Sequence, residues 1–236
     1  ILSYYHDAHA TIHPMYQCPL CHRLDCKAPL CPSCLVFMRQ LMRTDAYCLR
    51  CGNKKISSHN TVCSACAMIE SPINYFWTSF DYRAPLSKLI QIWKFHHRIT
   101  YSRALSYLML MNPPPWLKKH KIETAIAMPL TVKSYQQRLF NQSQELAKKI
   151  SQRYQIPLYP SHLLVKNNQE AQHKLSQKER FINMKHAFHI VKAPSCKNIL
   201  LIDDVATTMA TLNELAHTLR KKFNYQLFAW TLAKKS

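Results

Sequence analysis

Short apolar runs alternate with amphipathic stretches along the chain from about residue 72 onward. Over residues 84–111, apolar side chains recur at helical spacing, which predicts a helix in one or two pieces that ends before three consecutive prolines. A second helix is expected over residues 137–154. Strands are expected over residues 123–128, 162–165, 187–191, 198–203 and 227–232. Strands that alternate with helices favour an α/β domain whose mainly parallel sheet is covered by helices on both faces.

The first 70 residues follow a different pattern, because nine of the ten cysteines lie between residues 18 and 66. Eight of them form four Cys-x-x-Cys pairs, namely Cys18 and Cys21, Cys31 and Cys34, Cys48 and Cys51, and Cys63 and Cys66. Each pair points two thiolates at one point, and two pairs supply the four sulfur ligands that Zn²⁺ prefers. Sequence order suggests one ion in the first two pairs and a second ion in the last two, although the spacing also allows an interleaved arrangement.

Structural zinc is the expected role of these cysteines, since four thiolates leave no open position for a substrate. Iron–sulfur ligation is the main alternative, whereas a disulfide scaffold belongs to exported chains. We expect residues 1–70 to form a double zinc-ribbon module, followed by an α/β domain over residues 71–236. The single glycine, Gly52, follows Cys51, at a place where a metal-binding turn often needs a positive φ angle.

The charge of the chain is strongly positive, because 32 lysines and arginines face 12 aspartates and glutamates, for a formal charge of +20. Such a field attracts polyanions such as nucleic acids. Basic runs over residues 118–121 and 220–222 occur among aromatic residues, namely Trp93, Phe95, Trp116 and Tyr225. Cationic surfaces with aromatic platforms suit single-stranded DNA. Buried aromatic residues beneath an ordinary basic surface are the alternative.

No apolar run approaches the roughly 18 residues that a membrane-spanning helix needs. Residues 1–16 lack the apolar core of a secretory signal. The expected location is therefore the cytoplasm, where cysteines stay reduced and available to metals.

The most informative stretch is residues 198–211, in which a buried strand leads to Asp203 and Asp204 and then to a loop rich in hydroxyl side chains. Ligands of parallel sheets bind beyond the carboxyl ends of the strands, and the N-terminus of a following helix offers free N–H groups to a phosphate. The loop therefore predicts a phosphate site, and the acidic pair suits ribose hydroxyls or Mg²⁺. In the alternative, Asp203 only ends a strand and Thr211 caps a helix.

These residues resemble the phosphoribosyl diphosphate (PRPP) signature of type I phosphoribosyltransferases, in which two acidic residues precede two hydroxyl residues, usually a glycine, and then a threonine. With the cysteine pairs, the chain is similar to the ComF/GntX family of competence-related proteins, and its sheet is expected to be of the phosphoribosyltransferase kind. Three further motifs carry this resemblance: Tyr82 with Trp93, Lys94 and Phe95; Arg138, Leu139, Phe140, Asn141 and Gln142; and Gln172, Leu175, Arg180, Asn183, Ala187 and Phe188.

The resemblance implies a role for each site residue. Asp203 and Asp204 would be the catalytic pair that holds the ribose hydroxyls of PRPP, which binds with Mg²⁺. Lys133 and Arg138 would face the diphosphate. The loop residues that would hold the 5′-phosphate are Thr207, Thr208, Met209, Ala210 and Thr211. The family also implies natural transformation, with single-stranded DNA and competence-machinery proteins at the inner face of the cytoplasmic membrane as partners.

Met209 and Leu139 stand where that family usually has glycine. A glycine there permits a positive φ angle and close approach of the backbone to phosphate, so its loss could weaken PRPP binding. Two hypotheses follow. The first is a PRPP-binding competence protein, with phosphoribosyl transfer to an unidentified acceptor as its enzymatic form. The second is a non-enzymatic zinc-ribbon adaptor for DNA or proteins with a vestigial PRPP pocket. Thr207 replaces the Asp that purine-salvage relatives often use, which argues against purine salvage.

Overall fold

The computed structural model describes residues 16–44, 46–55, 60–167 and 187–235. Its helices are α1 (Pro32–Arg39), α2 (Ser64–Met68), α3 (Leu86–Phe95), α4 (Tyr101–Met111), α5 (Val132–Arg138), α6 (Gln142–Tyr154) and α8 (Ala210–Arg220), with a short 3₁₀ helix at Ser161–Leu163. Its strands are β1 (Tyr75–Asp81), β2 (Thr124–Ala127), β3 (Leu164–Lys166), β4 (Phe188–Ile190), β5 (Asn198–Ala206) and β6 (Gln226–Lys234).

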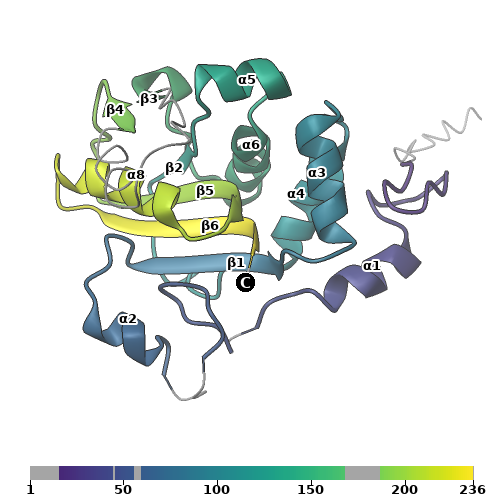
Figure 1. Cartoon of the computed structure of the whole chain (residues 1–236), viewed down its shortest axis with the longest axis horizontal. Coiled ribbons are helices and arrows are strands. Elements are labelled where there is room, and N and C mark those ends of the chain that lie inside the picture. The colour runs from purple at the N-terminus through teal and green to yellow at the C-terminus, as the bar shows by residue number, and fades with distance from the viewer. Residues whose placement is uncertain (1–15, 45, 56–59, 168–186, 236) are drawn as a thin grey trace, which may run out of the picture.

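Four parallel strands form the main sheet in the order β1-β6-β5-β2 (Figure 1). β3 and β4 form a separate antiparallel pair. The predicted α/β class with a mainly parallel sheet is confirmed, and each of the five expected strands has a counterpart in β2 to β6. β5 continues through the acidic pair to Ala206, beyond its expected end at Asp203. Because the strands of the main sheet run in one direction, their carboxyl ends meet at one edge, where ligands of such sheets bind.

The edge strand β1 is absent from the elements expected above. Its side chains Phe76, Trp77 and Phe80 are almost entirely buried. The outer edge of β1 is covered by the cysteine-rich region, since residues 41–43 and Leu49 make backbone hydrogen bonds with it. Covering protects an edge strand from pairing with another chain. The aromatic run that begins shortly after a proline is the signal that predicts this strand.

The inner strands alternate their side chains between two hydrophobic clusters. On β5, Leu200 and Ile202 face the cluster that contains the buried residues of α3, α4 and α6. Ile199 and Leu201 face the cluster that contains those of α8. Side chains of a strand alternate between its two faces, so a run of apolar residues indicates a strand that is buried on both sides. The expected covering of both faces by helices is confirmed (Figure 1).

The helix expected over residues 84–111 consists of two helices, α3 and α4, which an exposed turn separates. The helix expected from residue 137 instead begins at Gln142, so its predicted start was wrong. Leu139 has a left-handed φ of 65° that ends α5, and the Asn141 side chain then caps α6 by accepting a hydrogen bond from the N–H of Gln144 at 3.3 Å. Among the described residues, no helix has the length and apolar character needed to cross a membrane.

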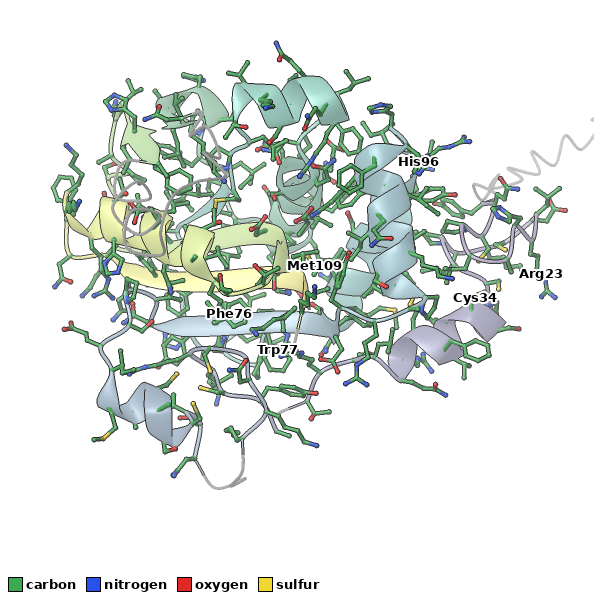
Figure 2. The ribbon with its side chains drawn as sticks, viewed as in Figure 1. Arg23, Cys34, Phe76, Trp77, His96 and Met109 are labelled. Atoms are coloured by element: carbon green, nitrogen blue, oxygen red, sulfur yellow. The ribbon has the colours of Figure 1, made fainter. Side chains whose placement is uncertain are left out.

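The first cysteine-rich segment packs directly against the α/β fold. Cys18, Leu30 and Cys31 are at most 1% exposed and belong to the same hydrophobic cluster as α3 and α4. Figure 2 shows this segment, marked by Arg23 and Cys34, on the side of the molecule where α3 lies. The two regions therefore share one core. The boundary expected near residue 70 stays a prediction.

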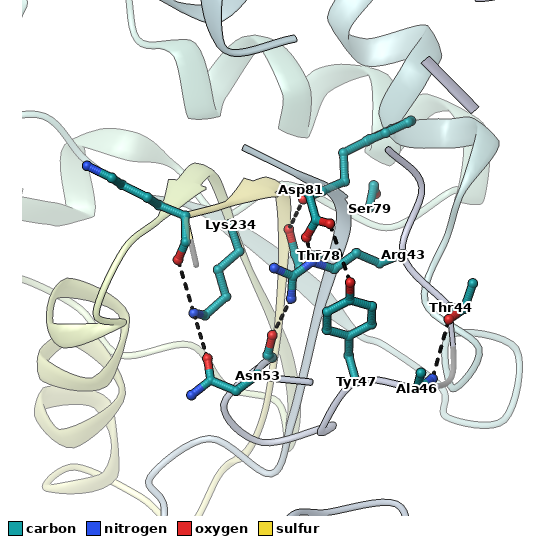
Figure 3. A network of polar contacts seen from close by, with 12 residues as sticks. Arg43, Thr44, Ala46, Tyr47, Asn53, Thr78, Ser79, Asp81 and Lys234 are labelled. Atoms are coloured by element: carbon teal, nitrogen blue, oxygen red, sulfur yellow. Dashed lines mark hydrogen bonds and ion pairs between the residues drawn. The ribbon is translucent and has the colours of Figure 1, made fainter. Parts of the chain in front are cut away.

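A buried polar network attaches the second cysteine-rich segment to the sheet (Figure 3). Arg43 is 3% exposed, and it donates from Nε to Asp81 Oδ1 at 2.7 Å and from Nη1 to the carbonyl oxygen of Gly52. The guanidinium lies 4.2 Å from the centre of the Tyr47 ring, whose hydroxyl donates to the other Asp81 oxygen at 3.3 Å. Breaking a buried ion pair leaves an uncompensated charge. Arg43 therefore fixes the Gly52 turn to the end of β1.

Replacing Gly52 with alanine tests whether this turn is fixed against the sheet. Gly52 has a φ of +67°, and a Cβ atom there would lie 2.4 Å from a ring carbon of Phe76. Because Phe76 is buried on β1, we expect Gly52→Ala to lower the free energy of unfolding of the metal-loaded protein by at least about 2 kcal/mol, measured by urea denaturation. Lys54→Ala, at an exposed neighbouring position, should change it by less than about 0.5 kcal/mol. Equal stability of Gly52→Ala and the wild type would contradict this packing.

Candidate functional site

The acidic pair lies at the carboxyl end of β5, where side chains from two helices hold it. Asp203 is half-buried, and its Oδ1 accepts hydrogen bonds from the hydroxyl of Ser143 on α6 at 2.8 Å and from the N–H of Asp204 at 2.9 Å. Asp204 is 5% exposed, and Nζ of Lys94 on α3 lies 2.9 and 2.8 Å from its two carboxylate oxygens. Both carboxylates therefore have fixed positions at the edge of the sheet where ligands bind.

The environment of Asp203 disfavours its charge. Burial raises the pKa of Asp203 from 3.8 to about 6, and the charge of Asp204 adds to this effect. The hydrogen bond from Ser143 and the charge of Lys94 lower the pKa without cancelling the increase. Carboxylates kept in such positions are typical of binding and catalytic sites. A cation bound beside the pair would reduce the repulsion between the two carboxylates.

The loop after the acidic pair turns sharply into α8. Thr207 and Thr208 are exposed, and Met209 has a left-handed φ of 63°. Met209 is the N-cap residue of α8 and makes no side-chain capping hydrogen bond, so the alternative in which Thr211 caps this helix is wrong. The N–H of Ala210 makes a long bond of 3.4 Å to the Thr208 hydroxyl. The N-terminus of α8 thus retains donors of the kind that bind phosphate.

Both positions where the resembled family has glycine take the conformation that glycine favours. Leu139 and Met209 have φ angles of 65° and 63°, and a non-glycine residue in this region carries strain of about 1–3 kcal/mol. The Met209 side chain is only 7% exposed and packs in the cluster that contains α8. Its bulk therefore lies in the core, and its φ angle is one that glycine adopts readily. Leu139 is 62% exposed and has no such compensation.

The motif at residues 138–142 forms the turn between α5 and α6. Arg138 donates to Gln142 Oε1 at 3.3 Å, and its guanidinium lies 5.8 Å from the centre of the Phe95 ring. The Asn141 side chain donates to the carbonyl oxygen of Met128 at 3.0 Å, directly after β2. The turn is therefore tied to the end of β2, and Arg138 lies over the end of α3.

Lys166 on β3 brings a further positive charge to this region. Burial lowers the pKa of Lys166. The negative charge of Asp203 raises this pKa, and the positive charge of Arg138 lowers it further, so the three groups interact. Lys166 also lines a cleft of about 590 Å³ bordered by β2, α5, α6 and β3. Lys133 lies on α5, where its side chain is exposed.

Three residues of this site, Lys94, Ser143 and Lys166, are not among the site residues expected from the sequence. Lys94 stands in one of the motifs that carry the family resemblance, and its position directly after the buried Trp93 is a signal for a side chain at the edge of the core. Ser143 and Lys166 have no local signal. Both interact with Asp203, which lies far along the chain from each of them.

The eight paired cysteines form two separate groups of four. The groups are Cys18, Cys21, Cys31 and Cys34, and Cys48, Cys51, Cys63 and Cys66. Within each group the sulfur atoms all lie within 4.8 Å of one another. The grouping expected from sequence order is confirmed, and an interleaved arrangement is excluded. Each group can hold a metal ion in the tetrahedral sulfur geometry.

In the second group, the hydrogen bonds to Cys48 favour its thiolate form. Cys48 Sγ accepts from the N–H groups of Arg50 at 3.4 Å and Cys63 at 3.3 Å. Burial by itself raises the pKa of Cys48, but backbone and side-chain hydrogen bonds outweigh burial and bring the pKa to about 7. The thiolate is the form that binds metals. Cys26 is also buried, but it lies outside both groups and donates to the carbonyl oxygen of Arg23 at 3.5 Å.

The motif expected between residues 172 and 188 is described only at its end. Ala187 and Phe188 are buried, at the start of β4. The remaining positions lie outside the described residues, and their roles stay predictions; they are Gln172, Leu175, Arg180 and Asn183.

Known proteins with similar sequences align with this chain over nearly their whole length. No family model matches the chain. The chain is 28% identical to Competence protein F of Haemophilus influenzae, over 88% of this chain and 91% of that protein. It is 29% identical to DNA utilization protein YhgH of Escherichia coli K12, over 89% of this chain and 95% of that protein. The chain is therefore similar to competence and DNA utilization proteins of the ComF type.

These similarities confirm the resemblance drawn from the motifs. The DNA utilization protein YhgH of Salmonella typhimurium is similarly related, at 26% identity over 89% of this chain and 95% of that protein. Because each alignment covers nearly nine tenths of the chain, the similarity includes both cysteine-rich and α/β parts.

Metal content tests the two cysteine groups. We expect two metal ions per chain by elemental analysis of protein purified without chelators. Cys34→Ser should retain one ion, because serine replaces a sulfur ligand in the first group. Cys26→Ser is the matched control and should retain both ions. Cys26 is a cysteine of the same segment and is buried, but it lies outside the group. The assignment of ligands would be contradicted if Cys26→Ser lost an ion while Cys34→Ser retained both.

The raised pKa of Asp203 predicts that its charge destabilises the fold. The native pKa of about 6 exceeds the usual 3.8, so ionised Asp203 lowers stability at all pH values above about 6, and this cost fades as the pH falls toward 4. Asp203→Asn keeps an oxygen that accepts from Ser143. We expect this variant to be more stable by about 1–2 kcal/mol at pH 8 and by less at pH 5, measured by urea denaturation.

Glu214→Gln, a neutralised carboxylate on α8, is the control for this measurement and should change stability by less than about 0.5 kcal/mol at both pH values. A loss of stability in Asp203→Asn that is the same at pH 5 and pH 8 would show that the charge of Asp203 is not disfavoured.

Proposed function

We propose that this protein is a competence protein of the ComF type that binds PRPP with Mg²⁺ at the end of β5 and assists the uptake or handling of single-stranded DNA. The observation that carries the proposal is the acidic pair at the carboxyl end of a buried parallel strand, followed by a helix N-terminus without a side-chain cap. The names of the relatives, Competence protein F and DNA utilization protein YhgH, support a role with DNA.

In this proposal the carboxylates of Asp203 and Asp204 accept hydrogen bonds from the ribose hydroxyls of PRPP. The positive charges of Arg138, Lys133 and Lys166 face the diphosphate, and Mg²⁺ supplies further neutralisation of its charge when bound. The 5′-phosphate binds to the turn and helix N-terminus formed by Thr207, Thr208, Met209, Ala210 and Thr211. The left-handed Met209 supports this assignment, because its side chain packs in the core and leaves the loop backbone open.

The enzymatic form of the proposal is phosphoribosyl transfer to an acceptor that the sequence does not identify. In this reaction a nucleophile attacks the ribose C1 while diphosphate leaves, and the protein contributes by orienting PRPP and stabilising charge. The cleft beside Lys166, of about 590 Å³, offers room for an acceptor. Thr207 stands where purine-salvage relatives often have Asp, so we expect the acceptor not to be a purine base.

We infer that the ions in the two cysteine groups are zinc and that their role is structural. Four thiolates in each group complete a tetrahedral shell and leave no position for substrate. A cytoplasmic location belongs to the same proposal, with contact to the inner face of the membrane through competence-machinery proteins.

A second candidate function is a non-enzymatic adaptor for DNA or proteins with a vestigial PRPP pocket. One observation favours it, since Lys94 Nζ lies against both carboxylate oxygens of Asp204 and competes there with any ligand. In the adaptor, this ion pair is a permanent structural contact. In the PRPP-binding protein, Lys94 positions Asp204 for the ribose.

Titration of PRPP into the zinc-loaded protein, with and without Mg²⁺, separates the two functions by calorimetry. We expect saturable binding to the wild type in the presence of Mg²⁺, and at least a tenfold weaker affinity, about 1.4 kcal/mol, for Asp203→Asn combined with Asp204→Asn. Each asparagine keeps one acceptor oxygen but replaces the other with a donor NH₂ group, and the loss of both charges removes the attraction for Mg²⁺.

Glu214→Gln is the control for charge removal near the same loop and should bind PRPP as the wild type does. Absence of binding to a folded, zinc-loaded wild type would overturn PRPP binding and leave the adaptor. Equal affinity of the wild type and the double variant would show that PRPP binds elsewhere.

A further inference from the structure

An exposed segment joins α3 to α4 and contains no carboxylate. All six residues from Phe95 to Thr100 are exposed, with Phe95 61% and Ile99 49% exposed. The segment carries two histidines and Arg98, and the left-handed φ of 52° at His97 turns the chain there. Figure 2 shows His96 at the end of α3, on the outside of the molecule. The Phe95 side chain is therefore accessible in solvent beside basic residues.

One end of this segment borders the acidic pair. Phe95 directly follows Lys94, whose ammonium group pairs with Asp204. Arg138 lies over the Phe95 ring at 5.8 Å, and the carbonyl oxygen of Arg138 lies 3.3 Å from His97 Nδ1. An aromatic face and a guanidinium thus adjoin each other at the edge of the candidate PRPP site.

The other end of the segment lines a cleft of about 660 Å³ between the first cysteine-rich segment and α4. The cations that line this cleft are Arg98, Arg103 and Lys149, and the aromatic side chains are Tyr16 and Tyr101. The guanidinium of Arg103 lies 5.4 Å from the centre of the Tyr16 ring. Among the residues that line the cleft, Glu145 is the single carboxylate, and Lys148 neutralises it at 2.7 Å.

Most of the aromatic residues considered with the basic runs in the sequence lie in the core. Of the four aromatic residues considered there, Trp93, Trp116 and Tyr225 are at most 3% exposed, and Phe95 is the one in solvent. In the run at residues 220–222, Arg220 donates to Asn74 Oδ1 at 2.9 Å and is committed to the fold. The alternative of buried aromatics beneath a basic surface is therefore correct for three of the four.

We propose that residues 95–100 and the adjoining cleft form a track for single-stranded DNA that runs from the first cysteine-rich segment to the edge of the acidic pair. Bases stack on Phe95, Tyr16 and Tyr101, while Arg98 and Arg103 contact phosphates. Stacking on aromatic faces combined with cations along the backbone is how proteins bind single strands without sequence preference. The track deepens the proposed function, since it rests on the DNA-handling role and gives it a surface.

Fluorescence anisotropy with a labelled oligothymidylate of about 16 nucleotides tests the track in the full, zinc-loaded chain. We expect Phe95→Ala to weaken binding about tenfold, the effect of removing the aromatic platform for one stacked base. Arg98→Ala combined with Arg103→Ala should lower the slope of log affinity against log salt by about 0.7 for each phosphate that is no longer neutralised. The matched control is Phe223→Ala, because Phe223 is 60% exposed and lies beside the basic run at residues 220–222. The affinity of this variant for the oligonucleotide should stay within twofold of that of the wild type.

The outcomes separate the track from the function on which it rests. A wild type that binds the oligonucleotide, with Phe95→Ala unchanged or Phe223→Ala weakened instead, would overturn the track and leave DNA handling intact. A wild type that binds PRPP and no oligonucleotide at low salt would overturn the DNA-handling role and the track together. Loss of DNA binding in the track variants with PRPP affinity unchanged supports both.

Discussion

Among the described residues, Lys94 and Asp204 form the ion pair that joins a covering helix to a central strand of the sheet. Two adjacent carboxylates lie on β5 where burial disfavours their charge. A buried charge without a partner destabilises the fold, so a cation is needed beside them. Lys94 compensates Asp204, whereas Ser143 gives Asp203 a single hydrogen bond and leaves its pKa raised. These contacts join α3 and α6 to β5 and leave an incompletely compensated charge that suits a ligand.

The cysteine-rich region contributes to the same edge of the sheet. Lys234, at the end of β6, donates to Asn53 Oδ1 at 3.0 Å, next to the Gly52 turn. A groove of about 310 Å³ is lined by Cys51 and Cys66 on one side and by the loop at residues 207–209 on the other. In small metal-binding segments with little core, metal binding contributes to the free energy of folding. A metal ion held by the second cysteine group would therefore stabilise one wall of the groove beside the loop at residues 207–209.

The sequence predicted the parts of the structure that have a local signal. The cysteine spacing identified both groups of thiols, and the apolar run before Asp203 identified β5. The edge strand β1 could have been found from its aromatic run, whereas Ser143 and Lys166 could not, because their interactions with Asp203 depend on the packing of α6 and β3. The resemblance marked Met209 as a position of positive φ angle, but the sequence did not show that burial of its side chain in the core accompanies this strained conformation.

A crystal structure of the zinc-loaded protein with saturating PRPP and Mg²⁺ tests the assignment of this edge most directly. We expect the ribose hydroxyls against Asp203 and Asp204, with the 5′-phosphate at the N-terminus of α8. Ordered PRPP bound elsewhere, with Lys94 still paired to Asp204 and the loop at residues 207–211 without ligand, would contradict the assignment.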